Sequence, residues 1–510
     1  MVESIFARYE RTVLDVYQRF DSLLENGDAK PLLLWHVLLA MVLPFCALLI
    51  PHQPRGWILR PVLSAIALSV SVETIRYRRA LLGANGYMVG LIMVWWLVWS
   101  STLLFFNDAE RNFRRIERVQ SHGTQDTGSQ QNGHASNEAH KPSEALGESD
   151  TLVWQPYPRS FVHRLGWTLA LVLTMRGPDF NFRISSLDPL PPQLKPKIVP
   201  LDDKWVCPQA KTRIRAAFIR FFVAYLAIDI LKLTMIWDPY FMGIISAPPP
   251  FPLNHLSAVP GLIRLYHSLL SGTAVYFALQ LVTALNPMFF LGLSTAFPNV
   301  FRAITATPLD APWLYADQFG QLNAVLDEGL TGTWGKWWHQ IFRFGFISTG
   351  KWILSFLPSA LSSRRSARRT IITVVAFAIS GAIHGFGSYT QLSDETRPIA
   401  ETFLFFILQP VGMFTQDIWN RTVVAQLKRN GLPPPCWLCR IGNVAFVIAW
   451  LLFSGSRIAD DFAKGGMWLT EPLPISPIRG LMGQGWNCWL TPWFERHDDG
   501  TFWGSGVRVI

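Results

Sequence analysis

Long apolar stretches alternate with short polar segments along most of this sequence. Residues 31–50 and 88–106 are clear examples, and the second contains no charged side chain. A helix rises about 1.5 Å per residue, so about twenty residues cross a hydrocarbon core of about 30 Å. The pattern therefore predicts helices that span a membrane.

Further apolar stretches continue the pattern toward the C-terminus. They cover approximately residues 57–75, 216–238, 262–296, 340–358, 371–391, 401–418 and 441–456. The stretch over 262–296 contains Asn286-Pro287, and we expect a break there because the proline ring removes a helical hydrogen bond. Together the stretches predict an all-α fold, a polytopic integral membrane helical bundle with roughly eight to ten membrane helices.

The same pattern divides the chain into four regions. An N-terminal region, 1–106, holds three membrane helices, and a core of 161–456 holds the others. Between them lies a polar loop, 107–160, which we expect to be disordered because its central part has almost no large apolar residues to bury. A C-terminal tail, 457–510, follows the last predicted span.

The composition supports the membrane assignment and removes several alternatives. Of 510 residues, 50% are apolar and only 16% are charged, while soluble proteins carry about a quarter charged residues. The net charge of +10 comes largely from short basic runs between the spans, such as Arg364–Arg369, which is typical of cytosolic loops in membrane proteins. We therefore expect membrane lipids around the chain and no nucleic-acid partner.

One histidine lies where a polar side chain is costly. His384 falls in ISGAIHGFGSY, inside an apolar run that contains no Asp, Glu, Lys or Arg. On a helix it lies about 21 Å from Thr370, deep in the membrane. A polar residue at such depth is by default a functional candidate, although a packed, hydrogen-bonded histidine is the alternative. The glycines at 381, 385 and 387 favour close packing or leave room for a ligand.

A second polar cluster lies in TWGKWWHQIFRFG, residues 333–345. If this segment is helical, Lys336, His339 and Arg343 share one face. An interfacial helix with cationic side chains reaching the lipid headgroups explains the lysine and the arginine without any chemistry. His339 is different, because it titrates near neutrality and can exchange protons.

Other polar groups in apolar segments are expected to be structural. Asp229 and Lys232, three residues apart, are expected to pair with each other inside the bundle. No metal site is predicted, because Cys436-x-x-Cys439 lacks a second ligand pair. The sequence also has no phosphate loop, no G-x-S-x-G elbow and no H-E-x-x-H motif.

The two histidine segments resemble a known family. W-G-x-x-W-H-Q-x-F-R around His339 and S-G-x-x-H-G around His384 resemble the fungal members of the wax synthase-like branch of the membrane-bound O-acyltransferases. Three other stretches agree with this resemblance: MRGPDFNF at 175–182, the approach to His339 from residue 326, and FFILQPVGMFTQD at 405–417. Plant members of that branch tend to have Asn where His339 stands.

The resemblance implies transfer of an acyl group from acyl-CoA to the hydroxyl of a hydrophobic alcohol. It implies that His384 is the essential catalytic residue and that His339 is a second catalytic residue. Gln340, Trp334 and Trp338 are expected to position the substrate or the oxyanion, and Lys336 and Arg343 are candidates for binding CoA. No metal and no tightly bound cofactor is expected, since acyl-CoA is a co-substrate.

The resemblance to the fungal members implies that this chain is an acetyltransferase. It would use acetyl-CoA and modify a terpenoid or meroterpenoid secondary metabolite. The expected location is the endoplasmic reticulum membrane. Two alternatives stay open at this point. One is a wax ester or sterol ester synthase with a long-chain donor, and the other is a polytopic transporter whose intramembrane histidines relay protons.

Overall fold

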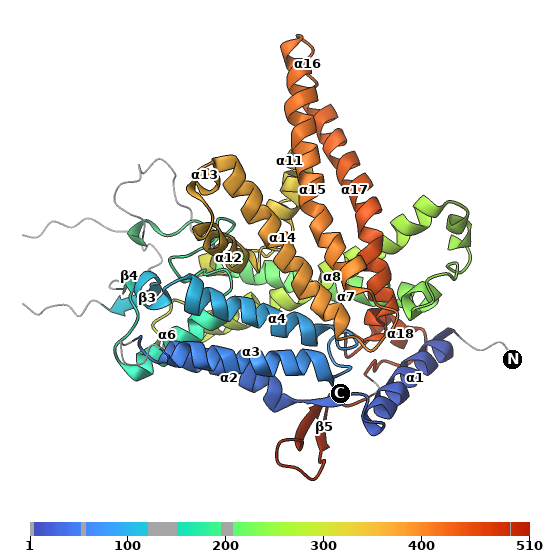
Figure 1. Cartoon of the computed structure of the whole chain (residues 1–510), viewed down its shortest axis with the longest axis horizontal. Helices are drawn as coiled ribbons and strands as arrows, with labels where there is room; N and C mark the ends of the chain where they lie inside the picture. Colours follow the sequence, from blue (N-terminus) through green and yellow to red (C-terminus); the bar gives the residue numbers. More distant parts are fainter. Residues whose placement is uncertain (1–4, 53–57, 121–149, 195–207, 490) are drawn as a thin grey trace, which may run out of the picture.

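The structure is a computed structural model in which almost every long segment is helical. It describes residues 5–52, 58–120, 150–194, 208–489 and 491–510. Figure 1 shows a body of packed helices from which one pair of antiparallel helices extends. The predicted all-α membrane bundle is therefore confirmed, with a few short strands added at its edges.

In the N-terminal third, the helices α2, α3 and α4 lie side by side and form a layer (Figure 1). The helices of this third are α1 (Ile5–Glu25), α2 (Leu34–Leu49), α3 (Leu59–Tyr77), α4 (Tyr87–Ser101), α5 (Ala109–Asn112) and α6 (Phe161–Leu173). Indole groups on α4 join it to α2 and to α6. Trp96 donates to the carbonyl of Ala40 in α2 at 3.0 Å, and Trp99 donates to that of Val172 in α6 at 2.9 Å. These bonds satisfy polar atoms that would otherwise be orphaned in an apolar core.

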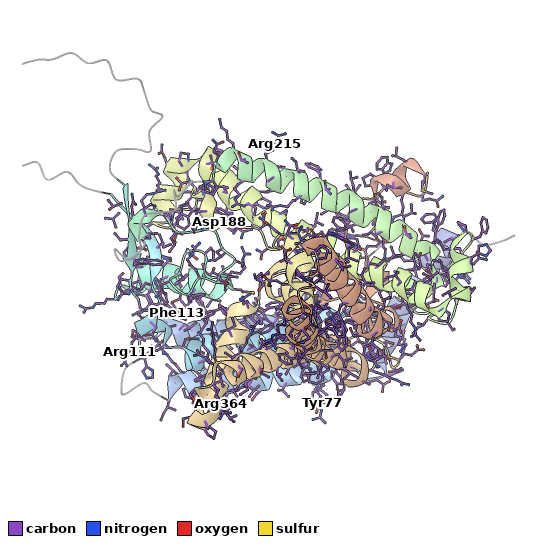
Figure 2. All side chains as sticks on the ribbon, turned by 90° about the horizontal axis from the view of Figure 1, so that it is seen from above. Tyr77, Arg111, Phe113, Asp188, Arg215 and Arg364 are labelled. Carbon is purple, nitrogen blue, oxygen red and sulfur yellow. The ribbon has the colours of Figure 1, made fainter. Side chains whose placement is uncertain are left out.

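The middle of the chain begins with a long helix along one border of the molecule. Figure 2 shows this helix, α7, in pale green, with Arg215 near one of its ends. The helices here are α7 (Ala210–Trp237), α8 (Pro260–Asn286), α9 (Gly292–Ala296), α10 (Pro298–Ile304), α11 (Asn323–Gly332), α12 (Arg343–Ser355) and α13 (Ser359–Ser362). A π-helical turn over Pro287–Leu291 follows α8 at the expected position. The expected break is nevertheless wrong, because Asn286 and Pro287 keep right-handed helical dihedral angles and Pro260–Ala296 remains one helical segment.

The last third contains the helix of His384 and the projecting pair. Its helices are α14 (Arg365–Tyr389), α15 (Leu404–Trp419), α16 (Ala425–Arg429), α17 (Cys436–Lys464) and α18 (Pro477–Leu481). In Figure 1, α15 and α17 are the two orange-red helices that extend beyond the body, with α16 at their tip. α14 packs against α4, α12 and α15, so it lies at the centre of the bundle.

Two small sheets lie at the edges of the bundle. The first has the order β2-β1-β6-β5 and joins the two ends of the chain, and the second is the hairpin β3-β4. The strands are β1 (Lys30–Leu33), β2 (Arg78–Arg79), β3 (Arg115–Gln120), β4 (Asp150–Gln155), β5 (Phe494–His497) and β6 (Gly506–Val509). The loop expected over 107–160 is thus ordered at both edges, while residues 121–149 of that prediction lie outside the described residues.

Five of the described helical segments are long and apolar enough to cross a membrane. They are Tyr87–Phe106, Pro260–Ala296, Arg365–Tyr389, Pro398–Leu427 and Cys436–Lys464, and the shorter apolar helices are Leu34–Leu49 and Phe161–Leu173. Fewer segments meet this criterion than the eight to ten expected helices. The stretch predicted over 340–358 is one reason, because its helix α12 has only 13 residues.

The C-terminal tail packs against the bundle, and this changes the interpretation of Asp229 and Lys232. The Asp229 carboxylate accepts hydrogen bonds from the Ser476 hydroxyl and from the backbone N–H of Ile478. The Lys232 ammonium donates to the carbonyls of Trp468 and Thr470. The expected pairing of the two residues with each other is wrong, because each side chain instead binds the segment that follows α17.

Candidate active site

His384 lies near the C-terminal end of α14, with small residues around it, as its sequence context predicts. An added Cβ at Gly381 would lie 2.8 Å from the ring of Phe403, and one at Gly387 would lie 2.9 Å from the ring of Tyr87. The glycines therefore let two aromatic side chains approach the helix directly beside the histidine. This confirms the expectation that they permit close packing.

The imidazole of His384 has two aromatic neighbours. Its Nδ1 lies 2.6 Å from the hydroxyl oxygen of Tyr87, the first residue of α4. Its ring stacks on Phe406 of α15, with ring centres 4.6 Å apart and planes within 11°. Among the described residues no hydrogen bond reaches Nε2, so this nitrogen is the one available to a substrate.

The segment that carries His339 is not the regular helix that its spacing suggested. Residues Thr333–Trp337 form one π-helical turn, Trp338 is extended with ψ 151°, and α12 begins only at Arg343. We name residues 333–342 the histidine loop. Lys336, His339 and Arg343 consequently do not share a helix face, and that expectation is wrong.

Side chains of the histidine loop hold it in this irregular shape. The amide of Gln340 donates to the carbonyls of Trp334, at 3.0 Å, and Trp338, at 2.6 Å. Arg343 donates to the Gly335 carbonyl and to the Gln340 side-chain oxygen, both at 2.6 Å. These bonds compete with the backbone ladder of a helix. Both N–H groups of the Gln340 amide are thus engaged within the loop, and its role in positioning the substrate or the oxyanion stays a prediction.

His339 lies in this loop beside His384. The two imidazoles are near enough to interact electrostatically. Aromatic rings surround His339, with the centres of Trp338 at 5.5 Å and Phe342 at 5.8 Å, and its Nδ1 is buried without a hydrogen-bond partner among the described residues. Burial lowers the pKa of His339 to about 4, so the ring is neutral at neutral pH. A neutral imidazole with a free nitrogen can donate or accept one hydrogen bond.

Two glutamines of α15 fasten the histidine loop, and the end of α11 that precedes it, to the core. Reasoning from the sequence missed them. The indole N–H of Trp334 donates to the Gln409 side chain at 3.2 Å, and the backbone N–H of Leu330 donates to Gln416 at 2.8 Å. Gly329 has φ +59°, and an added Cβ there would collide with the Gln416 amide. Buried amides in an apolar span were the available signal, because such groups are retained only with partners.

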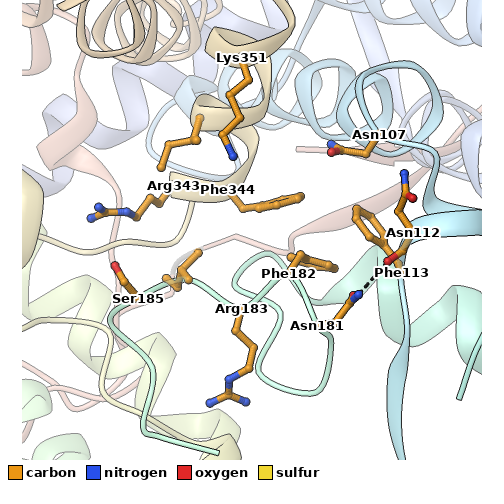
Figure 3. Close-up of a pocket in the computed structure, with 12 residues that line it drawn as sticks. Asn107, Asn112, Phe113, Asn181, Phe182, Arg183, Ser185, Arg343, Phe344 and Lys351 are labelled. Atoms are coloured by element: carbon orange, nitrogen blue, oxygen red, sulfur yellow. Dashed lines mark hydrogen bonds between the residues drawn. The ribbon is translucent and has the colours of Figure 1, made fainter. Parts of the chain in front are cut away.

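A pocket of about 470 Å³ opens beside the histidine loop, where α12 faces the loop after α6 (Figure 3). Its lining residues are Asn107, Asn112, Phe113, Asn181, Phe182, Arg183, Ile184, Ser185, Arg343, Phe344, Ile347 and Lys351. Figure 3 shows Lys351 extending from α12 into this space, while the guanidinium of Arg183 turns away from it. We call this space the basic pocket.

The basic pocket combines cations with amides and stacked rings. Phe182 stacks on Phe344 with ring centres 4.3 Å apart, and Lys351 is exposed without a carboxylate partner among the described residues. Such a lining suits a phosphate-bearing molecule with an aromatic base. Of the two residues expected to bind CoA, Arg343 lines this pocket, whereas Lys336 does not and pairs with Glu328 on the surface.

A comparison with protein families places both histidines in one matched region. Residues 315–408 match the model of the membrane bound O-acyl transferase family. That segment includes the histidine loop, α14 with His384, and the first part of α15 up to the residue before Gln409. No solved structure matches the chain.

Several curated fungal proteins are similar to the chain. It is 23% identical over 436 residues to the O-mevalon transferase macI of Penicillium terrestre, covering 82% of each chain. It is 25% identical over 303 residues to the O-mevalon transferase yanI of Aspergillus niger, covering 56% of this chain and 58% of the relative. It is also 27% identical over 154 residues to the acetyltransferase eriL of Hericium erinaceus, covering 30% of this chain and 38% of the relative.

Proposed function

We propose, from the premise that this chain is a membrane O-acyltransferase, that it transfers an acetyl group from acetyl-CoA to a hydroxyl of a hydrophobic secondary metabolite. The acceptor we propose is a terpenoid or meroterpenoid alcohol. One observation carries the proposal: two histidines 45 residues apart lie near enough to interact electrostatically within the segment that matches the acyltransferase family. The membrane we propose is that of the endoplasmic reticulum.

In this proposal His384 is the general base. The alcohol oxygen attacks the thioester carbonyl, a C–O bond forms, and Nε2 of His384 takes the hydroxyl proton. The tetrahedral intermediate then collapses, the C–S bond breaks, and the proton passes from Nε2 to the departing thiolate. A positioned base of this kind contributes about 10² to 10⁴ in rate.

His339 faces the same reaction from the histidine loop. Its neutral ring and unpartnered Nδ1 support a role as a hydrogen-bond donor to the thioester oxygen, where negative charge develops. A histidine with a depressed pKa holds a proton on one nitrogen without carrying a net charge. It can therefore polarise the carbonyl without competing with His384 for the proton.

The basic pocket is our proposed site for the phosphates and adenine of CoA. Lys351 supplies a cation that has no carboxylate partner in the described part of the chain, and the Phe182 and Phe344 rings supply apolar faces. Arg343 connects the two parts of the site, because it lines the pocket and also bonds the side chain of Gln340, next to His339. The donor would then lie with its head in the pocket and its thioester at the histidines.

A second candidate is transfer of a larger, oxygenated acyl group. The similarity that covers most of this chain is to a protein named an O-mevalon transferase, whereas the acetyltransferase similarity covers less than a third. A donor with the mevalonate carbon skeleton is therefore the main competitor to acetyl-CoA. Both donors share the thioester chemistry, so the histidine site serves either.

The experiment is an esterification assay in membranes that contain the full chain. Radiolabelled acetyl-CoA, a CoA thioester of the mevalonate skeleton and palmitoyl-CoA are each supplied with a panel of terpenoid alcohols. We expect a labelled ester from acetyl-CoA, with membranes from cells lacking the chain as the blank.

Other outcomes separate the alternatives. A higher rate with the mevalonate thioester would favour the second candidate. A preference for palmitoyl-CoA would support a wax or sterol ester synthase and contradict the acetyl proposal. Movement of a labelled solute or of protons across sealed vesicles, without any ester, would contradict acyl transfer.

A further inference from the structure

We propose that Tyr87 is the positioning residue of His384 and that α4 is built to hold its hydroxyl in place. This inference rests on the proposed function, because it concerns the base of that reaction. The Tyr87 hydroxyl lies 2.6 Å from Nδ1, and the Tyr87 side chain is buried, with 4% of its surface exposed. With Nδ1 occupied, Nε2 is the nitrogen presented to the substrate.

The turn before Tyr87 has an unusual backbone. Gly83, Ala84, Asn85 and Gly86 have φ values of 78°, 62°, 54° and 85°, so four consecutive residues are left-handed. For residues with a Cβ this conformation costs on the order of 1 kcal/mol or more each, and it persists only where the surroundings enforce it. The turn ends directly at Tyr87, which places this strain beside the histidine contact.

Hydrogen bonds from distant elements enforce this turn. The Asn85 side chain donates to the Gly465 carbonyl at 2.7 Å, and its backbone N–H donates to the Thr470 hydroxyl at 3.1 Å. From the end of α14, the Thr390 hydroxyl donates to the Gly86 carbonyl at 2.9 Å. The start of α4 is therefore bound both to the helix that carries His384 and to the segment after α17.

Direct backbone contact between α4 and α14 narrows the freedom of Tyr87 further. An added Cβ at Gly90 would lie 2.0 Å from the carbonyl oxygen of Phe386, and one at Gly387 would lie 2.9 Å from the Tyr87 ring. Packing this close is possible only with glycine. The ring of Phe462 covers Tyr87 from the other side, with ring centres 5.2 Å apart. The phenol consequently has little room to leave His384.

The proton balance explains what this contact does for the reaction. To take a proton on Nε2, His384 must carry its own proton on Nδ1, and that N–H then donates to the Tyr87 oxygen. When Nε2 receives the alcohol proton the imidazole becomes cationic, and the same hydrogen bond becomes charge-assisted and stronger. Asp461 lies near enough to act on Tyr87 electrostatically. Its negative charge therefore favours the positive charge that forms on the imidazole. Tyr87 thus orients the ring so that Nε2 faces the substrate, and it stabilises the protonated base.

The decisive variant is Tyr87→Phe, which keeps the ring and removes the hydroxyl. We expect kcat to fall about tenfold to a hundredfold, which corresponds to one charge-assisted hydrogen bond. The KM values for donor and alcohol should stay within about twofold of the parent, because the lost interaction becomes stronger only as His384 is protonated and does not involve the substrates. Tyr157→Phe is the matched control, since it likewise removes a hydrogen-bonded hydroxyl. That hydroxyl donates to the backbone carbonyl of Leu48 at 2.7 Å and not to a histidine of the site.

A second variant moves the phenol without changing it. Gly387→Ala places a methyl group against the Tyr87 ring and should lower kcat to a similar degree. Gly455→Ala in α17 is its control, because an added Cβ there meets no atom within 4 Å. The thermal stability of each purified variant in detergent shows whether a loss of rate is a loss of folded protein.

The results distinguish this inference from the proposed function. If His384→Ala is inactive while Tyr87→Phe keeps the parent kcat, the positioning role is wrong and the acyl-transfer proposal stands. A Tyr87→Phe loss matched by Tyr157→Phe, or explained by less folded protein, also contradicts the role. Full activity in His384→Ala would instead contradict the proposed function itself.

Discussion

Two regions of this chain bury polar side chains, and they do so in opposite ways. In the first, around His384 and His339, aromatic rings surround two imidazoles, and nitrogens remain without partners. In the second, between α7 and the segment after α17, Glu471 and Arg479 form a two-point ion pair at 2.9 and 2.7 Å. Asp229 and Lys232 are bound in the same region by the hydroxyl and backbone groups of the tail. We call the second region the tail cluster.

The difference separates chemistry from architecture. A buried polar group without a partner costs free energy, so it persists where a substrate supplies the partner or where function needs it. The tail cluster has its partners already and fixes the C-terminal segment to the bundle. Changes in the first region should therefore lower catalysis more than stability, and changes in the tail cluster should do the reverse.

The largest effect should follow His384→Ala. Removing the base should lower kcat by about 10² to 10⁴, while the thermal unfolding temperature in detergent stays close to that of the parent. Labelled-ester formation and a thermal melt on the same preparation measure both quantities. His255→Ala serves as the control, because this exposed histidine lies outside the site. Persistent ester formation would contradict the assignment of His384.

Glu471→Gln tests the tail cluster. It leaves the guanidinium of Arg479, whose side chain is 11% exposed, without its counter-charge. Breaking a buried pair in this way should destabilise the fold by about 3 to 5 kcal/mol, with kcat per folded molecule unchanged. Glu495→Gln is the control, since its pair with Arg508 is exposed and should contribute about 1 kcal/mol or less. A lower kcat in folded Glu471→Gln would contradict the conclusion that the tail cluster affects stability and not catalysis.

Asp179, in the loop after α6, belongs to neither region and is a buried carboxyl whose nearby charges only partly offset its burial. Burial raises the pKa of this carboxyl from 3.8 to about 6, although the nearby Arg115 opposes the shift. The native state thus binds an extra proton between about pH 4 and pH 6, so stability falls as the pH rises through that window. Asp179→Asn should remove this dependence and stabilise the fold at pH 7 by at most about 3 kcal/mol. Thermal melts at pH 4.5 and pH 7 measure it, and an unchanged slope would contradict the shift.

The smallest effect should be that of His339→Asn. An amide can donate a hydrogen bond to the thioester oxygen but cannot exchange a proton, so kcat should stay within about tenfold of the parent. His339→Ala, which lacks any donor, is the comparison and should lose more activity. Equal losses in the two variants would show that His339 acts through proton transfer instead.

Reasoning from the sequence located His384 and its surroundings well. One histidine in an apolar run is conspicuous because few polar groups are retained there, and the flanking glycines indicated close packing. It failed for the histidine loop, where spacing alone predicted a regular helix. Gln340 and Arg343 bind backbone carbonyls of that loop and override the helical ladder, and no local pattern signals this.

The residues that complete the site could not be found from local patterns either. Tyr87 lies 297 positions before His384, and its hydroxyl meets the imidazole only because α4 and α14 pack against each other. In the sequence Tyr87 is one aromatic residue at the start of an apolar span. The same holds for Gln409 and Gln416, whose partners, Trp334 in the histidine loop and Leu330 in α11, lie more than seventy residues away.

The sequence by itself determined that this chain is a helical membrane protein and which histidine lies deep in it. Both conclusions follow from hydrophobicity, a property of each residue in its own segment that needs no knowledge of neighbours. The tertiary structure decided which nitrogen of that histidine is free, which tyrosine holds the other, and where buried charges find partners. Hydrogen bonds act over about 3 Å and require direction, so only the packing of distant segments determines them.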